Sequence, residues 1–147
     1  EISCSLVGSE MCIRDSYKLA KALLAEGKPV SVVLGFNTAD EIFYADEFRA
    51  LGCDVHVATA DGSAGTKGFV TTAIAGDGID FDYFYACGPL PMLRALCDSV
   101  AQDGQLSFEE RMGCGFGACM GCSCKTKYGN KRICKEGPVL TKGEIIW

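Results

Sequence analysis

The sequence lacks the features that mark several special classes of protein. It has no run of about 18 apolar residues, so no segment is expected to cross a membrane as a helix. Basic residues are not in excess, since 14 Lys and Arg face 19 Asp and Glu, and binding to nucleic acid is not indicated. A hydrophobic share of 48% against 22% charged residues argues against disorder. No convincing signal peptide is present, and we expect a cytoplasmic protein.

Cysteine, by contrast, is abundant, and charge is unevenly spread. Four of the ten cysteines form one tight pattern in a glycine-rich segment near the C-terminus, and a fifth lies beside them. Residues 107–147 hold 7 Lys and Arg against 4 Asp and Glu, whereas residues 1–106 hold 7 against 15. One interpretation is a chance distribution of solvated faces. The other is two modules that meet near residue 105, the basic one facing an acidic or electron-carrying partner surface.

The first hundred residues alternate between helical and strand patterns. Apolar periodicity and flanking glycines predict helices over 17–26, 41–51, 69–75 and 91–103, and strands over 30–34, 54–59 and 81–86. Leu19, Leu23 and Leu24 form the apolar stripe of the first helix, and Thr38 or Asp40 is expected to cap the second. Strands rich in β-branched residues that alternate with helices indicate an α/β fold with a doubly wound parallel sheet.

Three loops are expected at the carboxyl ends of these strands, where such sheets bind ligands. They contain Gly35 and Asn37, then 60–68 with Asp61, and then Cys87-Gly88-Pro89. Asn37 or Asp61 could reach a ribose hydroxyl or an adenine edge. Because glycine ends strands in α/β proteins of every kind, a purely structural role for each loop stays open. His56 lies within a strand pattern and is expected on a face of the sheet rather than as a catalytic base.

The cysteine cluster is a more specific signal. Cys114, Cys119, Cys122 and Cys134 give the spacing C-x₄-C-x₂-C…C, which is typical of plant-type [2Fe–2S] sites. Three thiolates would come from one tight loop and the fourth from a returning strand after a hairpin near Gly129. The glycines of the loop would allow positive φ and turn N–H groups toward sulfur; they are Gly113, Gly115, Gly117 and Gly121.

Disulfide bonds and structural zinc are the two alternative uses of these cysteines. Disulfides suit a secreted protein, but no convincing signal peptide is present and several free-looking cysteines lie in the α/β part. Structural zinc usually takes two C-x₂₋₄-C pairs separated by a longer spacer. Cys124 is a fifth thiol within reach, and its offset from Cys122 on an emerging strand predicts that it points away from the site.

Two stretches carry a resemblance to a known family. GCGFGACMGCSCK, followed by KRICKEGPVL, resembles the cluster-binding region of the electron-transfer subunit of NAD-dependent (class 1B) dihydroorotate dehydrogenases. YACGPLPMLRAL is similar to the Cys-Gly-Pro-x-x-Met motif of the ferredoxin–NADP reductase-like superfamily. The resemblance covers about residues 17–147.

This resemblance implies an electron relay in pyrimidine biosynthesis. A catalytic FMN subunit would oxidise dihydroorotate, and electrons would pass through a [2Fe–2S] cluster and FAD to NAD⁺. The two kinds of subunit would form a heterotetramer, docked through the basic segment with Lys125, Lys127 and Lys131. The resemblance implies cluster ligation by Cys114, Cys119, Cys122 and Cys134.

The resemblance also assigns the nucleotide contacts. It implies that the nicotinamide end lies beside Cys87, Gly88, Pro89 and Met92, and the other end beside Gly35, Asn37, Asp61 and Gly62. The alternatives are a ferredoxin- or sulfide-linked NAD(P) reductase subunit and a non-enzymatic zinc or redox-sensing module.

The N-terminal segment departs from the family pattern. The family has an N-terminal flavin barrel, for which this chain has no room, so the chain alone is expected to be inactive. Where the family has a glycine-rich phosphate loop, residues 5–16 read SLVGSEMCIRDS, with Gly8 as the only glycine. We expect residues 1–16 to be non-native, residues 17–105 to form an NAD-binding domain without its first strand and phosphate loop, and residues 106–147 to form the cluster module.

Overall fold

A seven-stranded sheet organises the computed structural model, which describes residues 4–8 and 13–147. Its strands are β1 (Cys4–Gly8), β2 (Val30–Phe36), β3 (Asp54–Thr59), β4 (Thr66–Lys67), β5 (Tyr83–Gly88), β6 (Asp103–Phe108) and β9 (Val139–Thr141). The helices between them are α1 (Ile13–Ala25), α2 (Ala45–Leu51), α3 (Val70–Gly76) and α4 (Leu90–Ser99), with a short 3₁₀ turn η2 (Ala39–Glu41). A hairpin of β7 (Ser123–Thr126) and β8 (Gly129–Arg132), the short helix α5 (Ile133–Glu136) and the 3₁₀ turn η3 (Lys142–Glu144) complete the chain.

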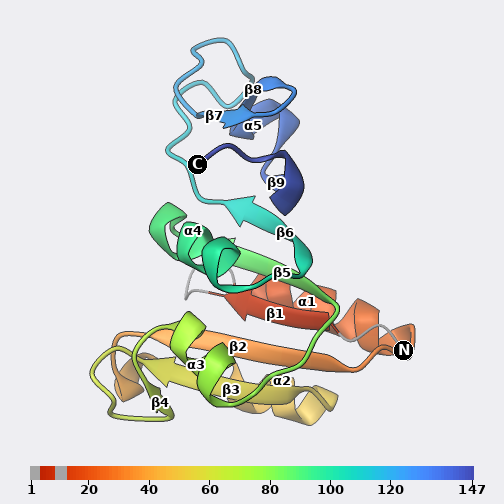
Figure 1. The fold of residues 1–147 in the computed structure, drawn as a ribbon, viewed down its shortest axis with the longest axis vertical. Helices are drawn as coiled ribbons and strands as arrows, with labels where there is room; N and C mark the ends of the chain where they lie inside the picture. The colour runs from red at the N-terminus through yellow and green to blue at the C-terminus, as the bar shows by residue number, and fades with distance from the viewer. Residues whose placement is uncertain (1–3, 9–12) are drawn as a thin grey trace.

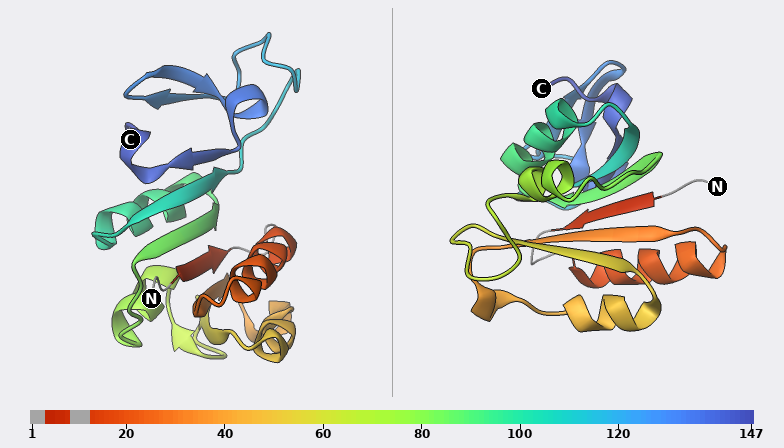
Figure 2. Two further views of the ribbon diagram at one scale, coloured as in Figure 1. Left: turned by 90° about the vertical axis from the view of Figure 1, so that its right-hand side faces the viewer. Right: turned by 60° about the horizontal axis from the view of Figure 1, so that its bottom comes forward.

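The order of the strands confirms a doubly wound fold. The sheet runs β4-β3-β2-β1-β5-β6-β9, and all neighbours are parallel except β6 and β9. From β1 to β4 successive strands are added on one side of β1, and β5 and β6 are added on its other side. The position between β1 and β5 is therefore the switch point, where such folds bind ligands. Figure 2 shows α1 and α2 on one face of the sheet and α3 and α4 on the other.

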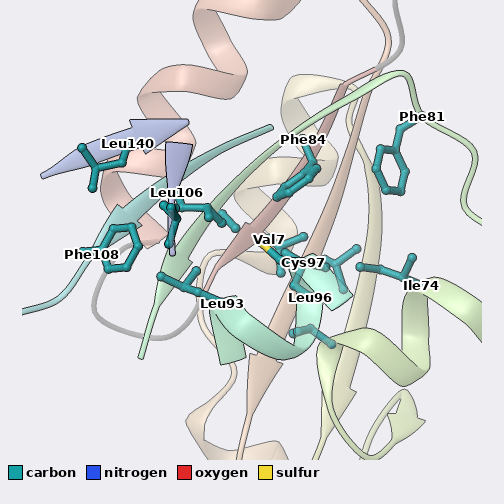
Figure 3. Close-up of a cluster of buried hydrophobic side chains, with 14 of the residues drawn as sticks. Val7, Ile74, Phe81, Phe84, Leu93, Leu96, Cys97, Leu106, Phe108 and Leu140 are labelled. Atoms are coloured by element: carbon teal, nitrogen blue, oxygen red, sulfur yellow. The ribbon is translucent and has the colours of Figure 1, made fainter. Parts of the chain in front are cut away.

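Each face of the sheet has its own apolar core. Alternation along β2 sends Val33 to the face covered by α3 and α4, and Val32 and Leu34 to the face covered by α1 and α2. The first core contains Phe84, Leu96 and Leu106, all fully buried (Figure 3). Burial on both faces explains why β2 is a nearly continuous apolar run.

The first predicted helix and two predicted strands are confirmed, with small shifts. Helix α1 begins earlier than expected, at Ile13, and buries Ile13, Ala20 and Leu23, while Leu19 and Leu24 are half-buried. It is followed by Gly27 at φ +76°, the left-handed conformation that glycine adopts readily after a helix. Strand β3 has the predicted bounds and β2 extends two residues further.

Two helices are shorter in the structure than the sequence predicts. Residues 39–51 form η2 and α2 rather than one helix, because Tyr44 takes a left-handed conformation (φ +65°) that interrupts it. The Thr38 side chain makes no capping hydrogen bond to η2. Helix α4 ends at Ser99, since Asp103–Phe108 is a strand hydrogen-bonded to β5 and β9.

The first strand of the sheet comes from residues that were expected to lie outside the domain, and the predicted domain bounds stay a prediction. Residues Cys4–Gly8 form β1, which pairs in parallel with β2 on one side and β5 on the other. Leu6 and Val7 are each 1% exposed and enter opposite cores, so this short apolar stretch fits the centre of the sheet. The rest of the expected phosphate-loop region, residues 9–12, lies outside the described residues. The non-native origin of residues 1–16 stays a prediction.

The predicted domain boundary at residues 105 and 106 falls inside β6. Strand β9 returns from the C-terminal segment and pairs antiparallel with β6, Leu106 opposite Leu140. The C-terminal segment is therefore joined to the sheet by a shared strand pair, and its hairpin lies beyond the sheet edge (Figure 1). No helix among the described residues has the length and apolarity needed to span a bilayer.

Candidate metal centre and nucleotide pocket

The cysteine loop leaves the sheet at the end of β6 and runs without helix or strand to the hairpin (Figure 1). Cys114 and Cys119 lie in this loop, with Cys119 exposed and Cys114 half-buried. Cys122 is 3% exposed and lies just before β7. Cys134 was expected on a returning strand, but it lies in α5, directly after β8. The hairpin itself, with Gly129 and Asn130 opening β8, is confirmed.

Backbone N–H groups point at two of the four sulfurs. Ala118 and Cys119 donate to Cys114 Sγ at 3.2 and 3.5 Å, and Cys134 donates to Cys122 Sγ at 3.4 Å. The N–H groups of Cys119 and Phe116 are the largest causes that lower the pKa of Cys114 to about 6. Since metals bind the thiolate, the loop already favours the ligating form of this cysteine.

Neighbouring cysteines of the loop affect one another's pKa. The Cys119 side chain contributes to the lowered pKa of Cys114, and Cys122 contributes to the raised pKa of Cys134. The pKa of Cys134 is raised by burial first, and then by its contact with Cys122 and by the negative charge of Cys122 and Cys114. The predicted ligands thus lie within electrostatic reach of one another at the end of the loop.

The four glycines of the loop differ in backbone conformation. Gly115 and Gly117 adopt φ of +73° and +90°, as predicted. Gly113 and Gly121 do not take positive φ; instead, a Cβ on either would lie 3.4–3.5 Å from Cys119 Sγ. Met120 takes a left-handed conformation (φ +58°), which the sequence did not reveal.

A charged pair anchors the loop to α5. The Arg132 Nη1 donates to the Gly117 carbonyl at 2.8 Å, and its guanidinium pairs with Glu136. The Arg132 side chain and N–H hold the pKa of Glu136 down at about 2. Within residues 4–8 and 13–147, no three His, Cys, Asp or Glu side chains stand close enough together to form a ready single-ion site. The residues nevertheless fit a thiolate-bound cluster in donor type and in the N–H groups directed at sulfur.

Cys124 has a different environment from these four. It lies on β7, is half-buried, and packs against the core on the α3 and α4 face. Burial is the main cause of its raised pKa, followed by the charges of Glu110 and Glu144. These features agree with the prediction that Cys124 is not a ligand, which stays a prediction.

A pocket of about 570 Å³ lies at the carboxyl ends of β2, β3 and β5. Of the predicted nucleotide contacts, it brings together Gly35, Asn37, Pro89 and Met92. A Cβ on Gly35 would lie 2.7 Å from Val70 Cγ1, so glycine permits β2 to pack closely on α3. The pocket is also lined by residues that sequence reasoning missed, namely Glu41, Phe69 and Glu109. An acidic residue shortly after the second strand was the available signal for Glu41.

The other four predicted contacts do not line this pocket. Asp61 and Gly62 lie in the next loop, where the Asp61 N–H bonds to the Asn37 carbonyl at 3.3 Å. Hydrogen bonds from Ser63 lower the pKa of Asp61, which keeps it ionised. Cys87 and Gly88 end β5 beside Ser107 and Phe108 of β6.

His56 occupies a face of the sheet, as predicted. Its Nδ1 lies 2.9 Å from Asp77 Oδ2 and its Nε2 lies 3.1 Å from Asp54 Oδ2. This contact ties β3 to the residue that follows α3. His56 is not among the residues that line the pocket at the ends of β2, β3 and β5.

The sheet order, the pocket at the switch point and the cysteine extension together define a ferredoxin–NADP reductase-like α/β unit. A solved structure described as "NADH-dependent reduced ferredoxin-NADP oxidoreductase" superposes with a TM-score of 0.84 at 31% identity, over 99% of this chain and 54% of that one. A flavohemoglobin from Malassezia yamatoensis shares the fold alone, with a TM-score of 0.56 and 14% identity over 67% of this chain and 28% of its own.

The sequence comparisons point to one family. Residues 109–146 match the family described as the iron–sulfur cluster binding domain of dihydroorotate dehydrogenase B. The chain is 44% identical to "Dihydroorotate dehydrogenase B (NAD(+)), electron transfer subunit" of Fusobacterium nucleatum, over 99% of this chain and 58% of that protein. It is 48% identical to the subunit of the same name in Lysinibacillus sphaericus, over 95% of this chain and 56% of that protein. The resemblance stated from the sequence is confirmed, and the chain spans a little over half the length of these relatives.

Proposed function

We propose that this chain is the nucleotide- and cluster-binding part of an electron-transfer subunit. In this proposal electrons from a dihydroorotate-oxidising FMN subunit pass through a [2Fe–2S] cluster and FAD to NAD⁺. The relatives' name, with its NAD(+) and its electron transfer subunit, supports this assignment. The flavin would be held largely by parts of the longer protein, and the complex would be a cytoplasmic heterotetramer.

The observation that carries the proposal is the cysteine loop fused to a nucleotide-binding sheet. Cys114, Cys119, Cys122 and Cys134 would supply four thiolates, and the N–H groups of Ala118 and Cys134 would bond to ligand sulfurs. A bound two-iron cluster supplies one-electron transfer, with a potential set partly by such hydrogen bonds. Arg132 would keep the loop closed through the Gly117 carbonyl.

The nucleotide would occupy the pocket at the ends of β2, β3 and β5. Its nicotinamide would lie toward Pro89 and Met92, and its adenosine toward Asn37. Cys87 and Gly88 would support the nicotinamide side from the end of β5, and Asp61 and Gly62 would border the adenosine side. Glycine at position 35 lets Val70 of α3 pack closely on β2 beside this pocket.

A ferredoxin-linked NAD(P) reductase subunit is the second candidate. The solved structure that superposes over 99% of this chain favours it. The two candidates differ in the protein that supplies or takes up electrons. Identifying that partner separates them.

Co-expression with a dihydroorotate-oxidising FMN subunit tests the proposal. We expect the two chains to co-purify as a complex that weakens with added salt, because the docking surface would be basic. Lys125→Glu combined with Lys127→Glu should abolish co-purification. These two lysines are exposed, whereas Lys131 pairs with Glu144 and would report on folding as well.

A matched double variant, Lys18→Glu with Lys21→Glu on the exposed side of α1, should leave the complex intact. Equal loss in both double variants would contradict a local docking surface. Stable binding to a ferredoxin and none to the FMN subunit would contradict the proposed function and favour the second candidate.

A further inference from the structure

Arg132 lies beside each of the chain segments that carry the predicted cluster ligands. These ligands are Cys114, Cys119, Cys122 and Cys134. The backbone of Arg132 pairs with Ser123 of β7, the residue that follows the third of these cysteines, and Arg132 precedes the fourth by two residues. Its Nη1 donates at 2.8 Å to the carbonyl of Gly117, which lies in the loop between the first two. A guanidinium is thus placed next to the segments from which the thiolates come.

Glu136 fixes the orientation of this guanidinium. Its Oε2 accepts the Arg132 backbone N–H at 2.7 Å and the Nε–H at 3.0 Å, and its Oε1 pairs with Nη2. The carboxylate therefore holds one edge of the planar guanidinium, while Nη1 reaches the Gly117 carbonyl. Contacts on both sides leave the Arg132 side chain little freedom to turn away from the loop.

The close approach at Gly117 depends on the absence of a side chain there. A Cβ on Gly117 would lie 3.3 Å from Arg132 Nη1 and 2.9 Å from Lys135 Cδ. Glycine also adopts readily the left-handed φ of +90° found at this position. The loop therefore lies directly against two basic side chains, of which Arg132 is half-buried and Lys135 is exposed.

The charges of the cysteines act on Arg132. The hydrogen bond to Glu136 is the main cause that raises the pKa of Arg132, and the carboxylate charge adds to it. The negative charges of Cys134 and Cys114 raise this pKa further, while burial opposes it. The Arg132 side chain is 26% exposed, so its charge is screened less than that of a fully solvated lysine.

A fixed positive charge at this place favours a reduced cluster over an oxidised one. Reduction adds one electron, so the cluster becomes more negative by one charge. Net charge and hydrogen bonding around a cluster are among the quantities that set its reduction potential. No proton needs to be taken up, because arginine stays charged throughout.

We propose that Arg132 raises the reduction potential of the cluster: its guanidinium, oriented by Glu136, stabilises the added electron as well as holding the loop against α5. The ion pair thereby sets the driving force for the one-electron step between a flavin and the cluster. This inference rests on the proposed function, because it requires the four cysteines to bind an iron–sulfur cluster.

The reduction potential of the reconstituted full chain tests the inference without any measurement of turnover. The cluster is assembled anaerobically with iron and sulfide, and the EPR signal of its reduced form is followed in a redox titration with dithionite. We expect Arg132→Gln to lower the equilibrium constant for one-electron reduction about tenfold, a shift of about 59 mV to more negative potential. Arg132→Lys keeps the charge and should restore most of the potential.

Glu136→Gln separates an electrostatic role from a structural one. It removes the negative charge of the pair and should raise the potential, whereas Arg132→Gln should lower it. Loosening of the loop would shift both variants in the same direction, because both break the same ion pair. Arg49→Gln is the matched control: it breaks an arginine–carboxylate pair with Asp46 in α2, at the opposite end of the molecule from the hairpin (Figure 1), and should leave the potential unchanged.

The outcomes distinguish this inference from the proposed function. Shifts of the same sign in Arg132→Gln and Glu136→Gln, or no shift in either, would overturn the role of Arg132 and leave the cluster standing. If Arg132→Gln assembles no cluster, Glu136→Gln decides alone: a higher potential supports the inference, and an unchanged or lower one overturns it. Failure of the unaltered chain to assemble an iron–sulfur cluster would overturn the proposed function together with this inference.

Discussion

The α/β sheet and the cysteine loop are stabilised in different ways. Both faces of the sheet bury large apolar side chains, and the strands satisfy one another's backbone groups. Residues 109–147 contribute only four buried apolar side chains, Cys122, Ile133, Leu140 and Ile145. Loop residues Met112, Phe116 and Met120 remain exposed, and the loop is held by hydrogen bonds to sulfur and by Arg132. The sheet is therefore stabilised mainly by its own burial, whereas a thiolate-bound group would add to the stability of the loop.

Replacing a buried phenylalanine of the sheet and an exposed one of the loop should give the largest difference in the free energy of unfolding. Phe84 is fully buried between the sheet and α4, so Phe84→Ala should lower the free energy of unfolding by about 3–5 kcal/mol. Phe116, 71% exposed in the loop, should change it by less than about 0.5 kcal/mol on replacement by alanine. Urea unfolding of the reduced chain measures both. Similar losses in the two variants would show that the loop packs as part of the core.

A glycine in β6 tests how closely β6 packs against β5. A Cβ on Gly104 would lie 2.5 Å from the Phe84 ring, so Gly104→Ala should destabilise the chain by about 1–3 kcal/mol. Gly143→Ala is the matched control, because nothing lies within 4 Å of a Cβ there. Equal unfolding midpoints for the two variants would contradict the close packing of β6 on β5.

The pH at which a cysteine becomes reactive should also differ between the loop and the sheet. Backbone hydrogen bonds lower the pKa of Cys114 to about 6, whereas burial is the main cause that raises the pKa of Cys97 to about 11. In the metal-free chain, alkylation of Cys114 by iodoacetamide should reach half its maximal rate near pH 6, and Cys97 should stay unmodified at pH 8. Peptide mass spectrometry measures both sites.

The sign of the accompanying stability change follows from the same shift. Because the folded pKa of Cys114 lies below its ordinary value, its stabilising contribution is full above that ordinary value and is lost as the pH falls toward 6. Alkylation of Cys114 that rises only above pH 8 would show that the loop does not stabilise the thiolate.

The strands that could be predicted from the sequence are those made mainly of apolar, β-branched residues. Val30–Phe36 and Asp54–Thr59 are rich in valine, and their pattern alone indicates strands. Strand β6, DGQLSF, was missed because it holds glycine and polar residues, and its strand character comes from pairing with β5 and β9. The break between η2 and α2 was missed because nothing local marks the left-handed conformation of Tyr44.

The candidate site was predictable in its chemistry more than in its geometry. The cysteine spacing located the loop and its hairpin, since four thiolates must converge from a short segment. It did not place Cys134 on a helix, because four residues after a strand carry too little periodicity to distinguish the two. Glu41 and Phe69 were missed because they come to line one pocket only when the loops after β2 and β3 fold together.

The central claim is that Cys114, Cys119, Cys122 and Cys134 hold a [2Fe–2S] cluster while the nearby Cys124 does not. Anaerobic reconstitution with iron and sulfide, read out by visible absorbance, iron and sulfide content and the EPR signal of the reduced protein, tests it most directly. We predict a red-brown chain whose cluster is retained in Cys124→Ser and lost in Cys134→Ser. A colourless zinc protein, or a cluster lost in Cys124→Ser and retained in Cys134→Ser, would contradict the account.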